Sequence, residues 1–137
     1  MTTPNLVQGF SERIWNAGDV DAASDLLVHD FVFRGSLGTE LHGREAFSEY
    51  VRSVRRALAD CRCEVIECVA EEDRAFAKMR FCGTHVGTFR GYPPTGKPVQ
   101  WTGAALFRFD GRAIADVWML GNLAGLDAVL RQNHAGE

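Results

Sequence analysis

The sequence predicts one α+β domain, spanning residues 1–137, in which a curved antiparallel sheet wraps around N-terminal helices. Apolar residues before Arg62 recur about every 3.6 positions, as on one face of a helix, and those beyond it recur every second position, as on one face of a strand. An Asp-Gly pair at 110–111 is the strongest short hairpin signal in the chain. Helices followed by an antiparallel meander are typical of this fold class.

The first two elements are predicted to be helices. Leu6, Phe10 and Ile14 recur every fourth residue, which predicts an amphipathic helix that ends near 16–18. Asp19 is a candidate N-cap for a short second helix.

A brief strand is expected over 31–33, and a third helix is expected to follow Gly43. One apolar stripe of that helix would face the core. The stripe consists of Phe47, Tyr50, Val51, Val54 and Leu58.

Two strands, 63–70 and 74–84, are predicted around a turn at 71–73. One face of the second strand is apolar and consists of Ala75, Ala77, Met79 and Phe81. Because side chains alternate along a strand, the same face continues to His85.

The segment 91–98 has the prolines and glycines of a turn, and the strand that follows it presents Trp101 to the interior. After the hairpin at 110–111, a strand over 112–120 is expected to place Asp116 on one face. The neighbours of Asp116 on that face are Ile114, Trp118 and Leu120. A C-terminal helix over 123–132 completes the predicted fold.

Composition narrows the class of function. The net charge is −3, and Lys and Arg are scattered among Asp and Glu, so no basic stripe is present for nucleic acid or a membrane surface. No apolar stretch approaches the roughly 20 residues of a membrane span. The four cysteines lack the spacing of zinc ligands, and no phosphate-binding loop is found. We therefore expect a cytoplasmic protein with reduced thiols, no metal and no nucleotide cofactor.

The run THVGTFRGYPPTGKPVQWTG, followed by FDGRAIADVW and GLDAVLRQ, resembles the SnoaL-type polyketide cyclases, or ester cyclases, of the nuclear-transport-factor-like superfamily. The resemblance covers nearly the whole chain. It implies a cone-shaped fold with a C-terminal helix, and a cofactor-independent aldol closure of an aromatic polyketide ester. In that chemistry a base removes a proton next to a carbonyl, and the enolate attacks a second carbonyl.

The resemblance places the catalytic base of the family four residues after the tryptophan, where this chain has Asn122 instead of aspartate. A carboxamide is not a useful base near neutral pH. Asn122 is left with two roles, which are compatible: donation to a developing enolate oxygen, or capping of the last helix.

His85 and Asp116 are the predicted replacements for the missing base, because both are expected on the apolar side of the sheet. The alternative for His85 is a hydrogen-bonded histidine that stabilises a hairpin. For Asp116 the alternative is a structural carboxylate that is also hydrogen-bonded.

Large aromatic residues are the candidate walls of a pocket for a flat ligand, although core packing is their more frequent use. These substrate-binding candidates are Trp15, Phe33, Phe89, Trp101 and Trp118.

Two kinds of function follow from the sequence. The first is an acid–base enzyme that acts on a hydrophobic, carbonyl-bearing small molecule, as a cyclase, an isomerase or a cofactor-free hydroxylase. The second is a non-catalytic ligand-binding or dimerisation protein that kept the fold and lost the base. In either case a homodimer is expected through the outer face of the sheet, carried by the odd-numbered residues 113–119.

Overall fold

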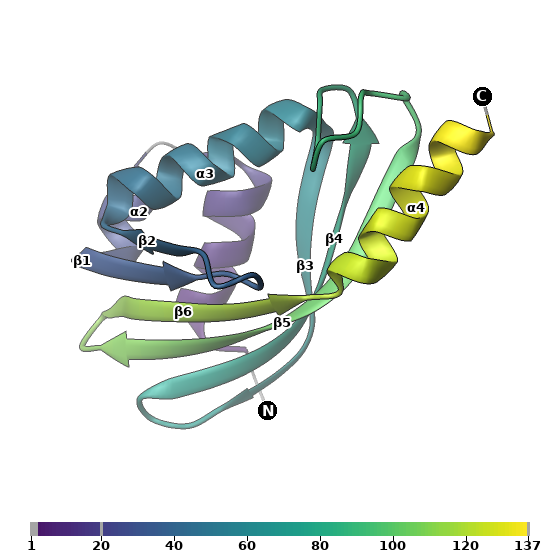
Figure 1. The fold of residues 1–137 in the computed structure, drawn as a ribbon. Coiled ribbons are helices and arrows are strands. Elements are labelled where there is room, and N and C mark those ends of the chain that lie inside the picture. Colours follow the sequence, from purple (N-terminus) through teal and green to yellow (C-terminus); the bar gives the residue numbers. More distant parts are fainter. Residues whose placement is uncertain (1–2, 20, 137) are drawn as a thin grey trace.

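Six strands form one bent sheet in the computed structural model, which describes residues 3–19 and 21–136 (Figure 1). All neighbouring strands are antiparallel except β1 and β6, which run parallel, and the sheet does not close into a barrel. In sheet order the strands are β2 (Glu40–His42), β1 (Leu27–Arg34), β6 (Ala113–Gly121), β5 (Pro98–Asp110), β4 (Arg74–His85) and β3 (Leu58–Ala70).

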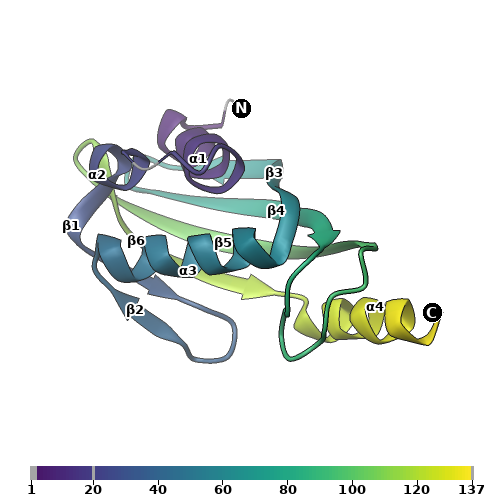
Figure 2. The same ribbon diagram turned by 90° about the horizontal axis from the view of Figure 1, so that it is seen from above.

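Helices lie against the concave side of this sheet (Figure 2), and a C-terminal helix follows β6. The predicted α+β class, with a curved sheet around N-terminal helices, is therefore confirmed. No helix within residues 3–19 or 21–136 combines the length and apolar character that a membrane span needs. The helices are α1 (Asn5–Gly9), which continues as the π-helical segment η1 (Phe10–Asn16), α2 (Ala22–Leu26), α3 (Arg44–Ala57) and α4 (Leu123–Ala135).

The first helix packs between α3 and the sheet. Phe10 has no exposed surface; its ring stacks on Phe47 of α3 at 5.7 Å and meets Phe107 of β5 edge-on at 5.1 Å. Such aromatic pairs add to the free energy gained by removing their surface from water. The four-residue spacing of apolar positions thus fixes which side of the helix faces inward.

Local signals located most element ends. Gly43 precedes α3 with φ at 91°, in the left-handed region that favours glycine. Asn122 caps α4, because its Oδ1 accepts a hydrogen bond from the amide of Gly125 at 2.9 Å. The predicted hairpin at 110–111 joins β5 to β6. The sequence did not predict β2 or the parallel pairing of β1 with β6, since both depend on long-range contacts rather than on a local pattern.

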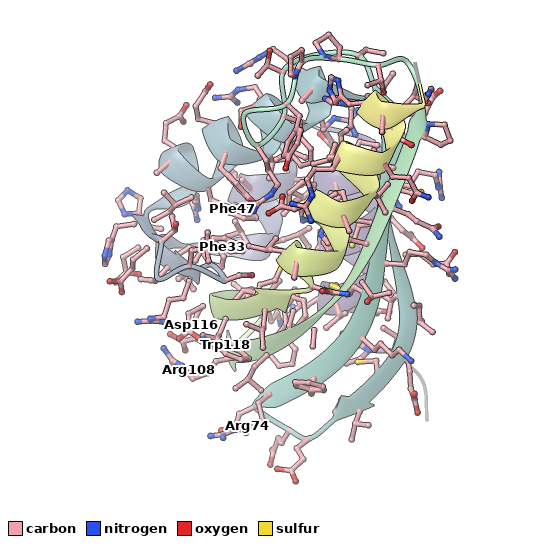
Figure 3. All side chains as sticks on the ribbon, turned by 45° about the vertical axis from the view of Figure 1, so that its right-hand side comes forward. Phe33, Phe47, Arg74, Arg108, Asp116 and Trp118 are labelled. Atoms are coloured by element: carbon pink, nitrogen blue, oxygen red, sulfur yellow. The ribbon has the colours of Figure 1, made fainter. Side chains whose placement is uncertain are left out.

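The prediction for the faces of β6 was wrong. Arg108 pairs with Asp116, but the next residue of β5, Phe109, pairs with Ile114, so Ala115 is an extra residue in a β-bulge. The bulge reverses the alternation. Ile114 and Val117 are both fully buried, and Asp116 faces outward (Figure 3).

Beyond the bulge, the convex face consequently carries Asp116, Trp118 and Leu120, not the odd-numbered residues within 113–119. Trp118 is 41% exposed and Leu120 is 51% exposed, whereas Met119 is buried. Figure 3 shows Trp118 on the same side as Arg108 and Asp116, away from Phe33 and Phe47. The prediction that Trp118 lines an internal pocket was therefore wrong for the same reason.

The cysteines behave as small core residues. Cys61 and Cys63 are buried, and all four thiols are free, as predicted. Burial raises the pKa of Cys63 to about 12, so this thiol is protonated and unreactive at neutral pH.

Candidate functional site

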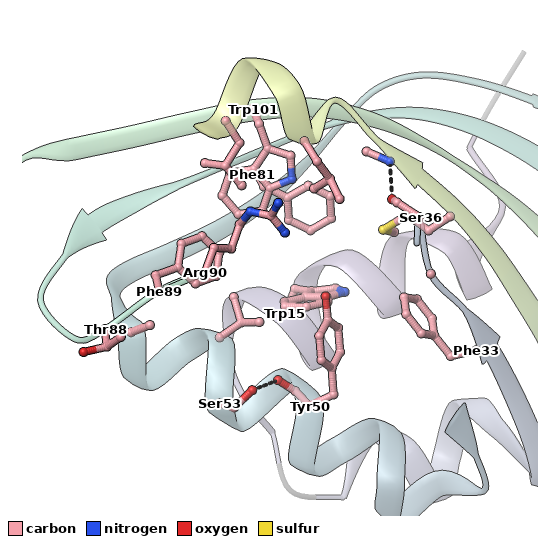
Figure 4. A pocket seen from close by; sticks show the side chains of 17 residues that line it. Trp15, Phe33, Ser36, Tyr50, Ser53, Phe81, Thr88, Phe89, Arg90 and Trp101 are labelled. Atoms are coloured by element: carbon pink, nitrogen blue, oxygen red, sulfur yellow. Dashed lines mark hydrogen bonds between the residues drawn. The ribbon is translucent and has the colours of Figure 1, made fainter. Parts of the chain in front are cut away.

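A pocket of about 340 Å³ lies on the concave side of the sheet, near the start of α4. Its walls come from η1, β1, α3, the sheet strands β4 to β6, the loop 86–97 and the first turn of α4 (Figure 4). These segments are far apart in the sequence, so only the tertiary fold brings them together. The volume is of the size that small organic ligands occupy in proteins.

Aromatic rings form a continuous wall around this pocket. Neighbouring rings are 5.3–6.1 Å apart between centroids. Phe81 and Trp101 are stacked with only 12° between their planes. A planar ligand can stack on or meet such rings edge-on. The series runs Phe33, Tyr50, Trp15, Phe81, Trp101 and Phe89.

Trp15 lines the pocket with its ring, not with its polar atom. Its Nε1 is inaccessible to solvent and has no hydrogen-bond partner among the described residues. An indole N–H can only donate, and leaving it unpaired in the interior costs about 1–3 kcal/mol. Because no accessible surface of Nε1 opens into the pocket, Trp15 contributes a flat aromatic wall there.

Two hydroxyl groups lie in the same lining. Tyr50 is 39% exposed overall, yet burial around its hydroxyl raises the pKa of this group, so it stays protonated at neutral pH and can donate. Ser36 Oγ accepts a hydrogen bond from the amide of Gly121 at 2.7 Å, which leaves its hydroxyl hydrogen for another acceptor (Figure 4).

Arg90 supplies the charged group of the pocket. It forms a two-residue turn with Gly91, because the amides and carbonyls of Phe89 and Tyr92 exchange hydrogen bonds at 3.0 and 2.9 Å. Both turn residues have positive φ, 52° and 84°, as a type I′ turn requires. Figure 4 shows the guanidinium of Arg90 reaching from this turn into the pocket.

Asp127 of α4 fixes the orientation of that guanidinium. Its carboxylate accepts from Nε and Nη2 of Arg90 at 2.8 and 3.1 Å, a two-pronged pair. Hydrogen bonding to Arg90 lowers the pKa of Asp127, so the carboxylate stays ionised. Asp127 does not itself line the pocket, and it acts there only through Arg90.

The pocket is rich in donors and contains no evident base. Within the described residues, none of the side chains that line it is a carboxylate, an imidazole or a carboxamide. Tyr50, Ser36 and Arg90 supply hydrogen-bond donors to it. This arrangement suits an oxygen atom that carries negative charge.

The predicted base Asp116 does not project into this pocket. It lies on the convex face, where its carboxylate is 2.6 Å from Nη2 of Arg108 and 3.9 Å from Nη1 of Arg34. The prediction of a carboxylate in the cavity was wrong because the bulge in β6 turns Asp116 outward. Its alternative, a structural carboxylate with partners, agrees with these contacts.

His85 faces inward, as its parity predicts, but it does not line the pocket. The side chain is fully buried, and neither ring nitrogen has a partner among the described residues. Its neighbours include the rings of Phe89 and His134, each with its centroid 6.5 Å away. The alternative prediction, that His85 is hydrogen-bonded and stabilises a hairpin, was therefore wrong, because neither ring nitrogen has a partner among the described residues.

Asn122 is the N-cap of α4 and does not line the pocket. Gly121 and Leu123 line the pocket, whereas Asn122 does not. The capping alternative is confirmed by its bond to Gly125, and a role in donation to a ligand stays a prediction.

Four of the five aromatic candidates lie on the pocket wall. These are Trp15, Phe33, Phe89 and Trp101, and their contact with a ligand stays a prediction. Sequence reasoning missed Tyr50, which it assigned to the helix core, and the polar residues Ser36 and Arg90. An arginine before glycine between two aromatic residues is the one signal that could have marked the turn at 90–91.

The fold and the pocket together define a class: a cone-like α+β domain with a pocket between its bent sheet and its helices. The model of the SnoaL-like polyketide cyclase family matches residues 5–132, so the chain belongs to that family.

A curated relative is the aklanonic acid methyl ester cyclase DauD of Streptomyces sp. (strain C5). It is 31% identical over 87 residues, which cover 61% of this chain and 53% of DauD. The match thus spans about half the length of this relative.

Solved structures share the fold over nearly the whole chain. AclR of Streptomyces galilaeus, a proposed hydroxylase, is 25% identical with a TM-score of 0.79, and 93% of each chain is covered. A proposed polyketide cyclase of Acidithiobacillus ferrooxidans is 22% identical with a TM-score of 0.85, covering 97% of this chain and 99% of that one. At 22% identity, the similarity to the Acidithiobacillus ferrooxidans protein supports the fold and not the function.

Proposed function

We propose that the protein is an enzyme that processes an aromatic polyketide or a similar flat, hydrophobic, carbonyl-bearing molecule. The observation that carries this proposal is the pocket, where a series of aromatic rings surrounds several hydrogen-bond donors. Trp15, Phe33, Phe89 and Trp101 would contact the rings of the ligand. Membership of the polyketide cyclase family and the likeness to an ester cyclase support the polyketide class.

The proposed chemistry passes through an enolate. Loss of a proton next to a carbonyl puts negative charge on an oxygen, which Arg90 and Tyr50 can stabilise by donation. One well-placed donor of this kind contributes roughly 2.7–4 kcal/mol to the transition state. The resemblance to the family implies that no cofactor takes part, and we include this in the proposal.

The electrophile that meets the enolate decides the reaction. Attack on a second carbonyl of the same molecule closes a ring, as in the family's cyclases. Hydroxylation is the second candidate: the enolate carbon would attack dioxygen, and an external two-electron reductant would reduce the resulting hydroperoxide to the alcohol and water. The likeness to AclR supports this reaction, and so does Asn122, which cannot serve as the base of a cyclase.

Turnover of aromatic polyketide esters tests this proposal. The native protein and Asn122→Asp are each mixed, in air and with dithiothreitol as reductant, with a cyclisable ester and a ring-closed anthraquinone, and products are separated by chromatography. Ring closure by the native protein supports a cyclase. Ring closure only by Asn122→Asp, with an oxygenated product from the native protein, supports the hydroxylase. Binding without any turnover in either variant would instead support a non-catalytic ligand-binding protein.

We further propose a homodimer through the convex face of the sheet. Val69, Phe76, Leu106 and Trp118 are direct partners across β3 to β6, and each is between 39% and 58% exposed. A contiguous apolar row on a sheet surface is typical of an association site. Sedimentation should show a dimer for the native chain and a monomer for Trp118→Lys. Leu37→Lys, in the β1–β2 loop, is the matched control and should stay dimeric.

A cytoplasmic location also stays a prediction.

A further inference from the structure

Arg90 is the one charged side chain of the pocket lining among the described residues. It can only donate, and two of its five N–H groups are used in the hydrogen bonds to Asp127. The guanidinium reaches into the pocket (Figure 4), so its other N–H groups can donate to a ligand there.

Tyr50 adds to this preference. Burial raises the pKa of its hydroxyl, so the group is neutral and able to donate, while the positive charge of Arg90 acts in the opposite direction on the same pKa. Arg90 lines the pocket and Asp127 does not, so a ligand in the pocket would meet the guanidinium rather than the carboxylate. A neutral carbonyl satisfies such donors weakly, whereas an ionised oxygen forms the stronger, charge-assisted hydrogen bonds.

We infer that the pocket binds its ligand as an anion, an enolate or a phenolate oxygen held by Arg90 and Tyr50, and that the ligand rather than a protein side chain is the source of the acidity. This inference rests on the proposed function and names the ionisation state of its substrate. The proton leaves the acidic C–H or O–H of the ligand for solvent, and the electron pair stays on the ligand oxygen. A pocket without a carboxylate or an imidazole in its described lining can then still act on an enolate.

Substrates of this kind are 1,3-dicarbonyl compounds and hydroxyquinones, which lose a proton far more readily than simple ketones. A carbonyl compound that ionises only in strong base would be a poor ligand. The substrate class is therefore narrower than hydrophobic and carbonyl-bearing: it must contain an acidic oxygen or carbon that can reach Arg90 from the stacking position between the rings.

The test compares 2-hydroxyanthraquinone with 2-methoxyanthraquinone, which cannot ionise. Binding to the native protein is followed by quenching of tryptophan fluorescence between about pH 5 and pH 9. For the hydroxy compound we expect the apparent Kd to fall about tenfold per pH unit below the pKa of the ligand, and to level off above it. For the methoxy compound we expect a flat profile.

The same pair of ligands helps to separate titration of the ligand from titration of protein side chains. The pKa of Asp127 is lowered and those of Tyr50 and Arg90 are raised, so these groups keep one charge state in this range. A protein group that changes the shape of the pocket affects both ligands, and a profile whose midpoint lies at the ligand's own pKa identifies the ligand as the titrating group. The other titratable side chains close to this region are Arg55, Cys61, His85, Tyr92, Arg131 and His134.

Variants assign the effect to Arg90. Arg90→Gln should weaken binding of the ionised hydroxy compound at least tenfold and change that of the methoxy compound less than twofold. Arg90→Lys, which keeps the charge, should recover part of the loss. Arg112→Gln, at the exposed β5–β6 hairpin, is the matched control and should bind both ligands as the native chain does.

Each result has one consequence. Equal affinities and flat profiles for both ligands would overturn the inference and leave the proposed function standing. Failure of both ligands to bind would overturn the proposed function and the inference with it. A steep pH profile that persists in Arg90→Gln would show that Arg90 does not hold the ionised oxygen.

Discussion

The two faces of the bent sheet each carry an arginine paired with an aspartate, and the two pairs differ in their surroundings. Arg90 and Asp127 meet at the wall of the aromatic pocket, with 26% and 28% of their side chains exposed. Arg108 and Asp116 meet on the convex face, where 57% of the arginine side chain is exposed. The first pair leaves donors directed at an enclosed space, and the second faces solvent. An arginine–aspartate pair therefore indicates a ligand-binding site on the concave side of the sheet but not on the convex side.

The largest expected difference between the two faces of the sheet is in the free energy of unfolding. Phe107 and Leu106 are neighbours on β5 with opposite orientations, since Phe107 is fully buried and Leu106 is 39% exposed. Phe107→Ala should lower the free energy of unfolding by about 3–5 kcal/mol, because it leaves a cavity against Phe10. Leu106→Ala should cost well under half as much. Urea denaturation of both variants measures this difference, and equal losses would contradict the assignment of faces.

The two arginines should differ next in catalysis. With a substrate found by the turnover screen, Arg90→Gln should reduce kcat by about 10²–10³, the usual loss for one donor to a developing oxyanion. Arg108→Gln should leave kcat within twofold, because its partner Asp116 lies on the other side of the sheet. Steady-state kinetics of the two variants, with circular dichroism to confirm folding, decide the matter. A comparable loss in Arg108→Gln would place function on the convex face.

The cap of α4 gives a smaller effect. Asn122→Ala removes the acceptor for the Gly125 amide and should cost about 1 kcal/mol of stability. Asn122→Asp keeps an acceptor at the same position and should retain most of the native stability. Thermal unfolding of the two variants separates capping from any role in turnover. An unchanged melting temperature in Asn122→Ala would mean that the cap contributes nothing.

The pH dependence of the Arg90 pair should be the smallest effect. Because Arg90 lowers the pKa of Asp127 in the folded protein, the stabilisation is present above the ordinary aspartate pKa and is lost as pH falls through the lowered value. Asp127→Asn should therefore cost at most about 1 kcal/mol at neutral pH, as partly exposed pairs do, and nothing in strong acid. Melting temperatures at the two pH values measure this. An equal cost at both would show that the lost stability is not electrostatic.

Much of the fold follows from local patterns. The helical spacing of Leu6, Phe10 and Ile14 predicted the first helix, and the alternation through Met79 and Phe81 predicted which face of β4 is buried. The Asp-Gly hairpin and the family resemblance completed the architecture. The candidate site was predicted less well: the aromatic walls were found in part, but the acid was assigned to the wrong face and the arginine was missed.

The sequence by itself determined the order of most helices and strands and the inward side of most of them, because hydrophobic periodicity and turn residues act over only a few neighbours. Its motifs also carried the resemblance to the family. Tertiary structure decided the rest. One extra residue at Ala115 turns Asp116 and Trp118 outward, and this bulge exists only through the pairing of β6 with β5. The pocket brings donors from the β1–β2 loop, α3 and the loop before β5 to one place, and such convergence depends on how distant segments pack.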